Sequence, residues 1–134
     1  MPENIEIVRR LCESLSRDSP DTPETLREFL DPAIEWHEDP SFSEAGVYCG
    51  IEACEEYARQ FTAEFSEIHY EVRETTDAGE DLIANMLIRG RGEESGAEFE
   101  LSAWWAFTIR DRKIVRCFAY LDRSRALEAI GLSE

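Results

Sequence analysis

The spacing of apolar residues changes along the chain from a helical period to a strand period. Apolar side chains recur every three or four positions in residues 4–18, 22–30 and 51–65, as they do on the buried face of an amphipathic helix. The Asp-Pro dipeptide at 31–32 ends the second of these segments, because the residue before a proline is disfavoured in a helix. The first half of the chain is therefore predicted to contain three helices.

Apolar and polar residues alternate in other segments, which is typical of half-buried strands. Two short segments of this kind, residues 33–38 and 47–49, separate the second helix from the third. A terminal helix is expected after Asp122, which can act as its N-cap, and before Gly131, which can end it. Between these helices the alternation predicts four further strands, at residues 67–79, 81–92, 97–110 and 113–121.

Three helices followed by a run of antiparallel strands indicate an α+β fold. A long curved sheet that is covered on one side by helices leaves a conical cavity between the two layers, and such a cavity can hold a small apolar ligand. The length of 134 residues suits one domain, residues 1–134, and the chain contains no internal repeat.

The charge of the chain excludes some classes of partner. A net charge of −16 repels phosphate groups, so neither nucleic acid nor an anionic membrane is an expected partner. No apolar run has the length of a membrane span, and the amino terminus lacks the features of a secretion signal. The four cysteines form no CxxC motif and have no zinc-finger spacing. We therefore expect a cytoplasmic protein without a disulfide scaffold.

The segment IEWHEDPSF, residues 34–42, combines a histidine with several carboxylates. His37 can act as a general base at neutral pH, since the reference pKa of imidazole is about 6.5. The alternative is a strand-end histidine that only pairs with a neighbouring carboxylate. Glu35, His37 and Asp39 share one face of a strand, which raises a metal site as a third possibility. Such alternation arises easily on an acidic sheet, and we expect no bound metal.

The last two strands place aromatic residues on both faces of the sheet. The apolar parity of residues 97–110, which includes Trp105 and Phe107, is expected to face the helices. Trp104, Phe118 and Tyr120 lie on the opposite face, where an exposed tryptophan is a good anchor for a homodimer interface. The alternative is that a loop or a neighbouring strand covers this tryptophan. The inward side of the last strand is predicted to hold Val115, Cys117, Ala119 and Leu121.

Four segments of the sequence, together with this order of elements, resemble those of a known protein family. They are FLDPAIEWHEDP, GVYCGIEACEEYARQF, TTDAGEDLIANMLIRGRG and RKIVRCFAYLDRSRALEAIGL. With them, residues 4–132 resemble the SnoaL-like branch of the NTF2-like superfamily, which includes ketosteroid isomerases, polyketide cyclases and limonene-epoxide hydrolases. The resemblance implies an NTF2-like cone with a small-molecule pocket, no obligatory cofactor, and a homodimer through the outer face of the sheet. The fold hosts enzymes and binding proteins alike.

The general base of the isomerases falls on His37, and a shift of one or two residues would move this role to Glu38 or Asp39. The two groups that stabilise the enolate in those enzymes fall on Leu11 and Trp105, and a leucine donates no hydrogen bond. The resemblance therefore favours a cyclase-type acid/base enzyme over a ketosteroid isomerase. Such an enzyme would act without metal or organic cofactor on a small apolar cyclic or polyketide-like molecule.

Two alternatives to an enzyme stay open, a non-catalytic binding module and a homodimeric scaffold with a filled cone. An enzyme and a binding module would have the same pocket wall. The residues expected to line it are Trp36, Tyr48, Tyr57, Phe61, Trp105 and Phe107.

Overall fold

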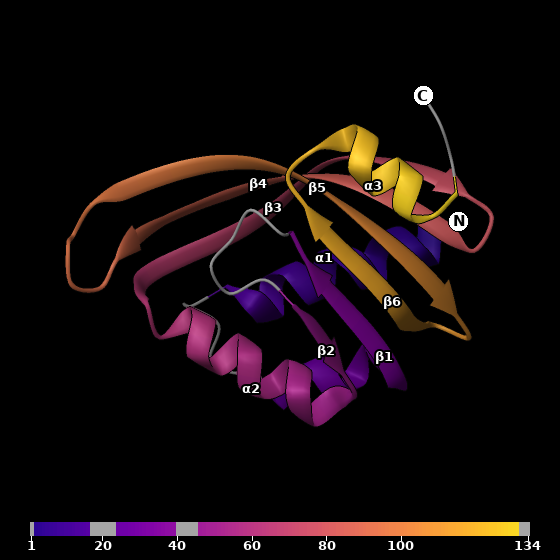
Figure 1. Ribbon diagram of the computed structural model, residues 1–134, viewed down its shortest axis with the longest axis horizontal. Helices are drawn as coiled ribbons and strands as arrows, with labels where there is room; N and C mark the ends of the chain where they lie inside the picture. Colours follow the sequence, from indigo (N-terminus) through magenta and orange to yellow (C-terminus); the bar gives the residue numbers. More distant parts are fainter. Residues whose placement is uncertain (1, 17–23, 40–45, 132–134) are drawn as a thin grey trace.

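The predicted helices and strands are present in the computed structural model, which describes residues 2–16, 24–39 and 46–131 (Figure 1). The helical elements are α1 (Pro2–Leu15), η1 (Glu24–Glu28), α2 (Ile51–Thr62) and α3 (Arg123–Ala129). The strands are β1 (Leu30–Glu38), β2 (Val47–Cys49), β3 (Phe65–Ala78), β4 (Asp81–Gly92), β5 (Glu98–Arg110) and β6 (Lys113–Tyr120). No helix in the described ranges has the length and apolar character needed to cross a membrane.

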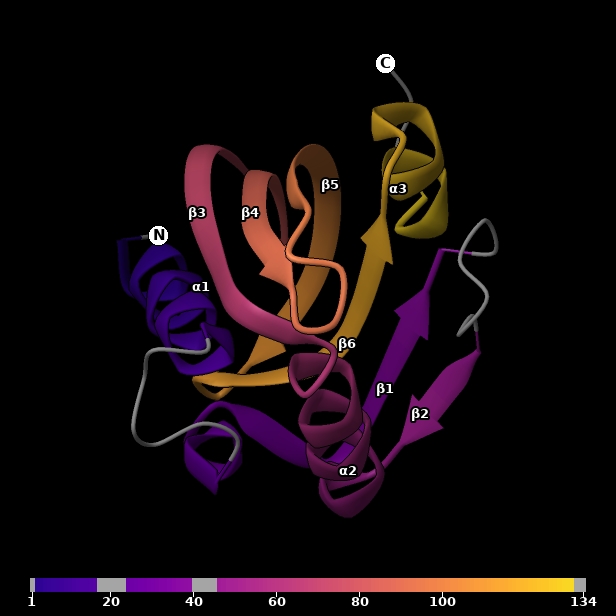
Figure 2. The same cartoon turned by 90° about the vertical axis from the view of Figure 1, so that its left-hand side faces the viewer.

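The described strands form one curved sheet in the order β2-β1-β6-β5-β4-β3. Strands β1 and β6 are parallel, and the other neighbouring pairs are antiparallel. The concave face of the sheet holds α1, which contacts β3, and α2, which contacts β1 (Figure 2). Helix α3 lies on the outer face against β5 and β6. The predicted α+β cone is confirmed, and its last helix covers the side opposite to the other helices.

Two apolar clusters lie on the two faces of this sheet. The larger cluster fills the concave side, where Leu11, Ile34 and Phe107 are fully buried. The smaller cluster lies under α3 and includes Ala106 and Phe118. Because successive residues of a strand point to opposite faces, β5 and β6 contribute side chains to both clusters.

Two helices differ from their predicted extent. The second, expected over residues 22–30, is the short 3₁₀ helix η1, and residues 22 and 23 lie outside the described part of the chain. The third, expected to reach Phe65, ends at Thr62. Phe65 instead opens β3, and its ring packs on Phe61 at 5.2 Å between ring centroids. Phe65 therefore belongs to the strand that follows the helix, although it has helical spacing from Phe61.

An irregularity in the last strand moves one residue away from its predicted face. Ile114 is fully buried in the inner cluster, and the next residue of β6 in that cluster is Cys117. The register between β5 and β6 shifts between Thr108 and Ile109, and a bulge of this kind breaks the alternation of side chains. Val115 therefore lines a groove on the outer face, and its predicted inward position is wrong.

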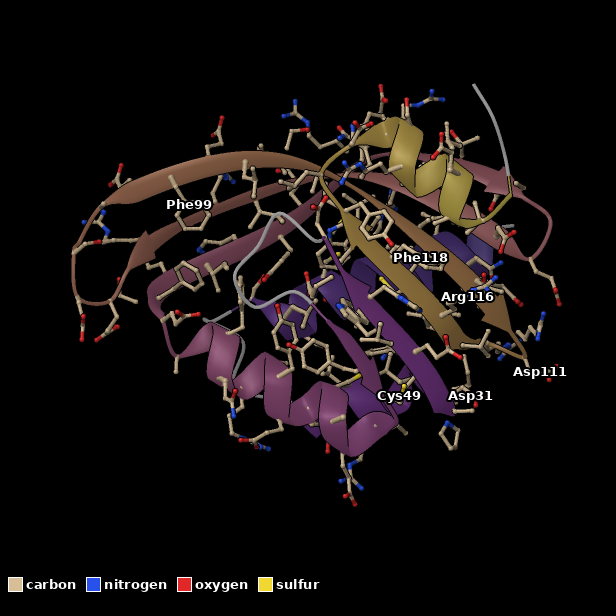
Figure 3. The ribbon with its side chains drawn as sticks, viewed as in Figure 1. Asp31, Cys49, Phe99, Asp111, Arg116 and Phe118 are labelled. Carbon is tan, nitrogen blue, oxygen red and sulfur yellow. The ribbon has the colours of Figure 1, made fainter. Side chains whose placement is uncertain are left out.

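Gly90 allows an aromatic ring to lie directly on the backbone of β4. This residue pairs with Ile68 of β3 and with Phe99 of β5. A Cβ atom at Gly90 would lie 2.6 Å from the carbonyl oxygen of Glu67 and 2.8 Å from the ring of Phe99 (labelled in Figure 3). Glycine in a strand often marks such a close approach.

The substitution Gly90→Ala is therefore expected to lower the free energy of unfolding by about 1–3 kcal/mol, because the added methyl group forces the backbone or the ring to move. Urea denaturation measures this change. Gly46→Ala is the matched control, since no atom of the described residues other than its chain neighbours lies within 4 Å of a Cβ at that position, and its effect should stay within about 0.5 kcal/mol. Equal stability of the two variants would contradict the close approach at Gly90.

Candidate functional site

A cavity lies between the concave face of the sheet and helix α2. The volume open to the centre of a water molecule is about 60 Å³, several times the roughly 10–15 Å³ that one buried water needs. The wall is mostly apolar, and Glu38 is its one carboxylate among the described residues. Four of the six residues predicted for the pocket line it, namely Trp36, Tyr57, Phe61 and Trp105.

Strand β1 supplies three of the lining side chains, namely Leu30, Trp36 and Glu38. Trp36 and Glu38 line the cavity and have the same parity as the fully buried Ile34. Across the parallel ladder their partners on β6 are Cys117 and Ala119, which are small enough to leave space beside the acid.

His37, the residue predicted as the general base, lies on the outer face of the sheet and does not line the cavity. Its ring stacks on Phe118 with 4.5 Å between the ring centroids, and its Nε2 atom lies 3.3 Å from Oε1 of Glu35. Phe118 belongs to the apolar cluster under α3. The sheet itself therefore separates this imidazole from the cavity. A strand-end histidine paired with a carboxylate, the simpler alternative, describes His37.

Glu38, onto which a shift of one residue would move the role of the base, lies in the wall of the cavity. Its Oε1 atom accepts a hydrogen bond from Nε1 of Trp36 at 2.9 Å, and the hydroxyl of Tyr57 is a second hydrogen-bond partner. Burial raises the pKa of Glu38 to about 7, against the lowering effect of these two hydrogen bonds, and the charge of Asp39 adds to the rise. Near pH 7 the side chain therefore exists in both protonation states.

The sequence carries a signal for this acid. Ile34, Trp36 and Glu38 share one parity, and the first two are the large apolar residues of the predicted strand, residues 33–38. Side chains two apart on a strand face the same side. The carboxylate next in that series therefore belongs to the buried face, whereas His37 belongs to the other.

Three further polar groups of the wall keep their protons near neutral pH. Burial raises the pKa of Cys54 to about 12. The pKa values of Tyr57 and Tyr70 lie above their usual range, because burial and the neighbouring Glu38 carboxylate both disfavour a phenolate. These groups are therefore hydrogen-bond donors. No lysine, arginine or histidine is found among the described residues of the wall.

Aromatic rings form much of the wall. The rings of Trp36 and Trp105 meet edge to face, with 5.4 Å between centroids and 87° between planes. Tyr48 lies behind the wall, where it stacks on Tyr57 at 4.2 Å. Phe107 also lies behind it, fully buried at 6.2 Å from Trp105. Tyr48 and Phe107 thus support the lining residues, and their predicted places in the wall are wrong.

Asp39, the other acid near the predicted position, has a structural role. Its side chain is 2% exposed, and its Oδ2 atom accepts a hydrogen bond from the backbone N–H of Leu121 at 2.9 Å. Its own backbone N–H donates to the carbonyl of Ala119 at 3.2 Å. These bonds tie the end of β1 to the end of β6 and thereby hold Glu38 in place.

Helix α2, which carries Tyr57, is held at its start and along its side. Gly50 precedes it with a φ of 89°, a conformation that favours glycine, and its N–H donates to the carbonyl of Ile34 at 2.8 Å. Arg27 of η1 donates two hydrogen bonds, of 2.8 and 3.0 Å, to the carboxylate of Glu55. The guanidinium also lowers the pKa of Glu55.

The three residues predicted for a dimer interface lie on the outer face but are not freely exposed. Phe118, labelled in Figure 3, is 8% exposed. Trp104 and Tyr120 are partly buried against the same cluster under α3. The guanidinium of Arg123 lies 5.5 Å from the ring centre of Trp104. The terminal helix of the same chain therefore supplies the cover, an arrangement that the sequence did not indicate.

The structure also bears on the predicted helix cap at Asp122 and on the metal site considered for the acidic strand. Asp122 caps α3, since its Oδ1 atom accepts a hydrogen bond from the N–H of Ser124 at 2.8 Å. Within residues 2–16, 24–39 and 46–131, no three His, Cys, Asp or Glu side chains converge as ligands for a metal ion.

Solved structures of other proteins share this fold. A proposed SnoaL-like polyketide cyclase from Jannaschia sp. CCS1 has a TM-score of 0.78 and 18% identity, over 96% of this chain and 89% of that one. A protein of ketosteroid isomerase-like fold from Catenulispora acidiphila, in complex with trimethylamine, has a TM-score of 0.76 and 16% identity, over 95% and 93%. IdmH, a proposed polyketide cyclase from Streptomyces antibioticus, has a TM-score of 0.73 and 19% identity, over 96% and 99%.

At this level of identity the structural similarity shows the fold alone. No curated protein matches the chain in a sequence search. A family model described as a SnoaL-like domain matches residues 8–117, a segment that contains Glu38 and most of the cavity wall. The chain therefore belongs to the SnoaL-like domain family.

Proposed function

We propose that the protein is a cofactor-independent acid/base enzyme, of the isomerase or cyclase type, with Glu38 as its proton carrier. The observation that carries the proposal is one carboxylate in an apolar cavity whose pKa is raised to about 7 by burial. A general base is most effective when its pKa lies near the pH at which it works. The proposed substrate is a small apolar cyclic or polyketide-like molecule.

The neighbours of Glu38 suit the transfer of a proton from a carbon atom. The indole N–H of Trp36 holds one carboxylate oxygen, and the hydroxyl of Tyr57 is a second hydrogen-bond partner, so that the carboxylate is held in place beside the cavity. Tyr70 lines the cavity and keeps its own proton, and its hydroxyl can therefore donate to a substrate oxygen that gains negative charge. This donor would replace the one that Leu11 cannot supply.

A second candidate function is a binding module without chemistry, which uses the same cavity. One observation favours it: a protein of the same fold was found in complex with trimethylamine. In this case Glu38 would hold a ligand rather than move a proton.

We also propose a homodimer and a cytoplasmic location. In a homodimer through the outer face, the partly buried Trp104 and Tyr120 would contribute together with α3. The four cysteines are free thiols, which suits a reducing compartment.

The enzyme proposal predicts that the protein accelerates the exchange of α-protons for deuterium in at least one of a panel of small cyclic ketones. NMR spectroscopy in deuterated water measures this rate. Glu38→Gln should reduce it by about 10²–10⁴-fold, and His37→Ala should leave it within about twofold. The rate should rise with pH up to about 7 and then level off, because the carboxylate is the active form. A larger loss in His37→Ala than in Glu38→Gln would reverse the assignment.

The raised pKa of Glu38 also predicts a pH-dependent stability. The folded protein holds this proton up to about pH 7, whereas an unfolded glutamate releases it near 4.5. The folded state binds more protons between these values, so this group's contribution to stability falls as the pH rises through that window. Glu38→Gln should therefore raise the free energy of unfolding by roughly 1–3 kcal/mol at about pH 8, and by little near pH 4.5.

Urea denaturation at a series of pH values measures this effect. The control is Glu100→Gln, which changes an exposed acid on β5 and should give no comparable gain at high pH. A destabilised Glu38→Gln variant at high pH would show that the carboxylate is compensated by another group.

A further inference from the structure

Among the described residues of the cavity wall, the carboxylate of Glu38 has no positive partner. Its hydrogen-bond donors, the indole N–H of Trp36 and the hydroxyl of Tyr57, are neutral groups. No lysine, arginine or histidine is present among the lining residues that the structure describes. A carboxylate that is buried without a cation raises the free energy of the folded state. A ligand that brings its own positive charge would remove this cost.

Aromatic rings from four elements surround the same space. Trp36 comes from β1, Tyr57 and Phe61 from α2, Tyr70 from β3, and Trp105 from β5. The planes of Trp36 and Trp105 lie at 87° to each other, and those of Tyr70 and Trp105 at 56°. Rings in several orientations therefore border the cavity. The faces of aromatic rings attract cations, and groups of such rings recognise quaternary ammonium ligands.

The net charge of the whole chain also favours a positively charged ligand. A net charge of −16 raises the concentration of cations near the protein and opposes the approach of anions. Inside the cavity, an anionic ligand would meet the Glu38 carboxylate without a compensating group, and a neutral ligand would leave that carboxylate uncompensated.

We propose that the cavity binds a small organic cation, either an amine in its ammonium form or a quaternary ammonium compound. The charged nitrogen lies against Glu38, and its alkyl groups contact the rings of Trp36, Trp105 and Tyr70. The inference rests on the ligand pocket of the proposed function and names the charge of its ligand, but it requires no catalysis.

The groups that face Glu38 determine how this binding depends on pH. The tyrosines and cysteines that face Glu38 are Cys54 and Tyr57 from α2, Tyr70 from β3 and Cys117 from β6. Burial keeps their pKa values well above 7, so they stay neutral at the pH where Glu38 changes its charge. Asp39 lies next to Glu38 in the chain and is tied to the backbone of Leu121.

The test compares two molecules of nearly equal shape, choline and 3,3-dimethylbutan-1-ol, in which a carbon atom replaces the charged nitrogen. Trp36 and Trp105 border the cavity, so tryptophan fluorescence and the indole N–H signals in NMR spectra report binding. At constant ionic strength and about pH 8, choline should bind at least about tenfold more tightly than the alcohol. Because choline keeps its charge, its affinity should fall about tenfold towards pH 5.5 as Glu38 takes up a proton.

Two variants localise the effect. Glu38→Gln should bind choline about tenfold more weakly at pH 8 and without dependence on pH. Glu35→Gln changes an exposed acid on the outer face of the same strand and should bind as the parent protein does. The comparison of choline with the alcohol needs no variant, so it stays decisive if Glu38→Gln does not fold.

Equal or tighter binding of the alcohol would overturn the proposal, as would a choline affinity that does not change with pH. The enzyme proposal is tested separately by deuterium exchange. Choline binding without exchange would support the cation site and contradict the enzyme. Exchange without choline binding would support the enzyme and contradict the cation site.

Discussion

The parallel ladder between β1 and β6 decides which side chains of β1 enter the cavity. It places Glu38 opposite Ala119, a small residue that leaves space in front of the acid. Asp39 closes the ladder, since its N–H donates to the carbonyl of Ala119 and its carboxylate accepts the N–H of Leu121. A slip of one residue would turn Glu38 to the outer face and bring His37 inside. The chemistry of the cavity thus depends on backbone hydrogen bonds and on the buried carboxylate of Asp39, which does not itself line the cavity.

Two acids show how the same side chain is put to different uses by its surroundings. Glu55 is 6% exposed and accepts two hydrogen bonds from Arg27, so its pKa is lowered and it stays ionised. It joins η1 to α2 and thereby positions Tyr57. The donors to Glu38 among the described residues are neutral, and burial raises its pKa to about 7. An acid without a counter-ion is a cost to folding, and groups of this kind are often found at functional sites.

The two faces of the sheet divide structural and functional roles. On the concave face, Trp36 and Trp105 are 7% and 6% exposed and belong to the main apolar core, yet they also border the cavity. On the outer face, α3 covers Phe118, and the stack of His37 on Phe118 extends this second cluster. The fold of the SnoaL-like domain is common to proteins of several kinds, so the identity of the few polar groups in the wall carries the functional argument.

The sequence alone determined the kind and order of the elements, the cap at Asp122 and the family, because apolar periodicity and capping are local properties of the chain. The resemblance to the family pointed to residues 37–39 for an acid or a base, without deciding which of them faces the cavity. Only the tertiary structure decided that Glu38 faces inward, that Val115 faces outward, and that α3 covers Trp104. These outcomes depend on strand register and on contacts between residues far apart in the chain, which no local pattern contains.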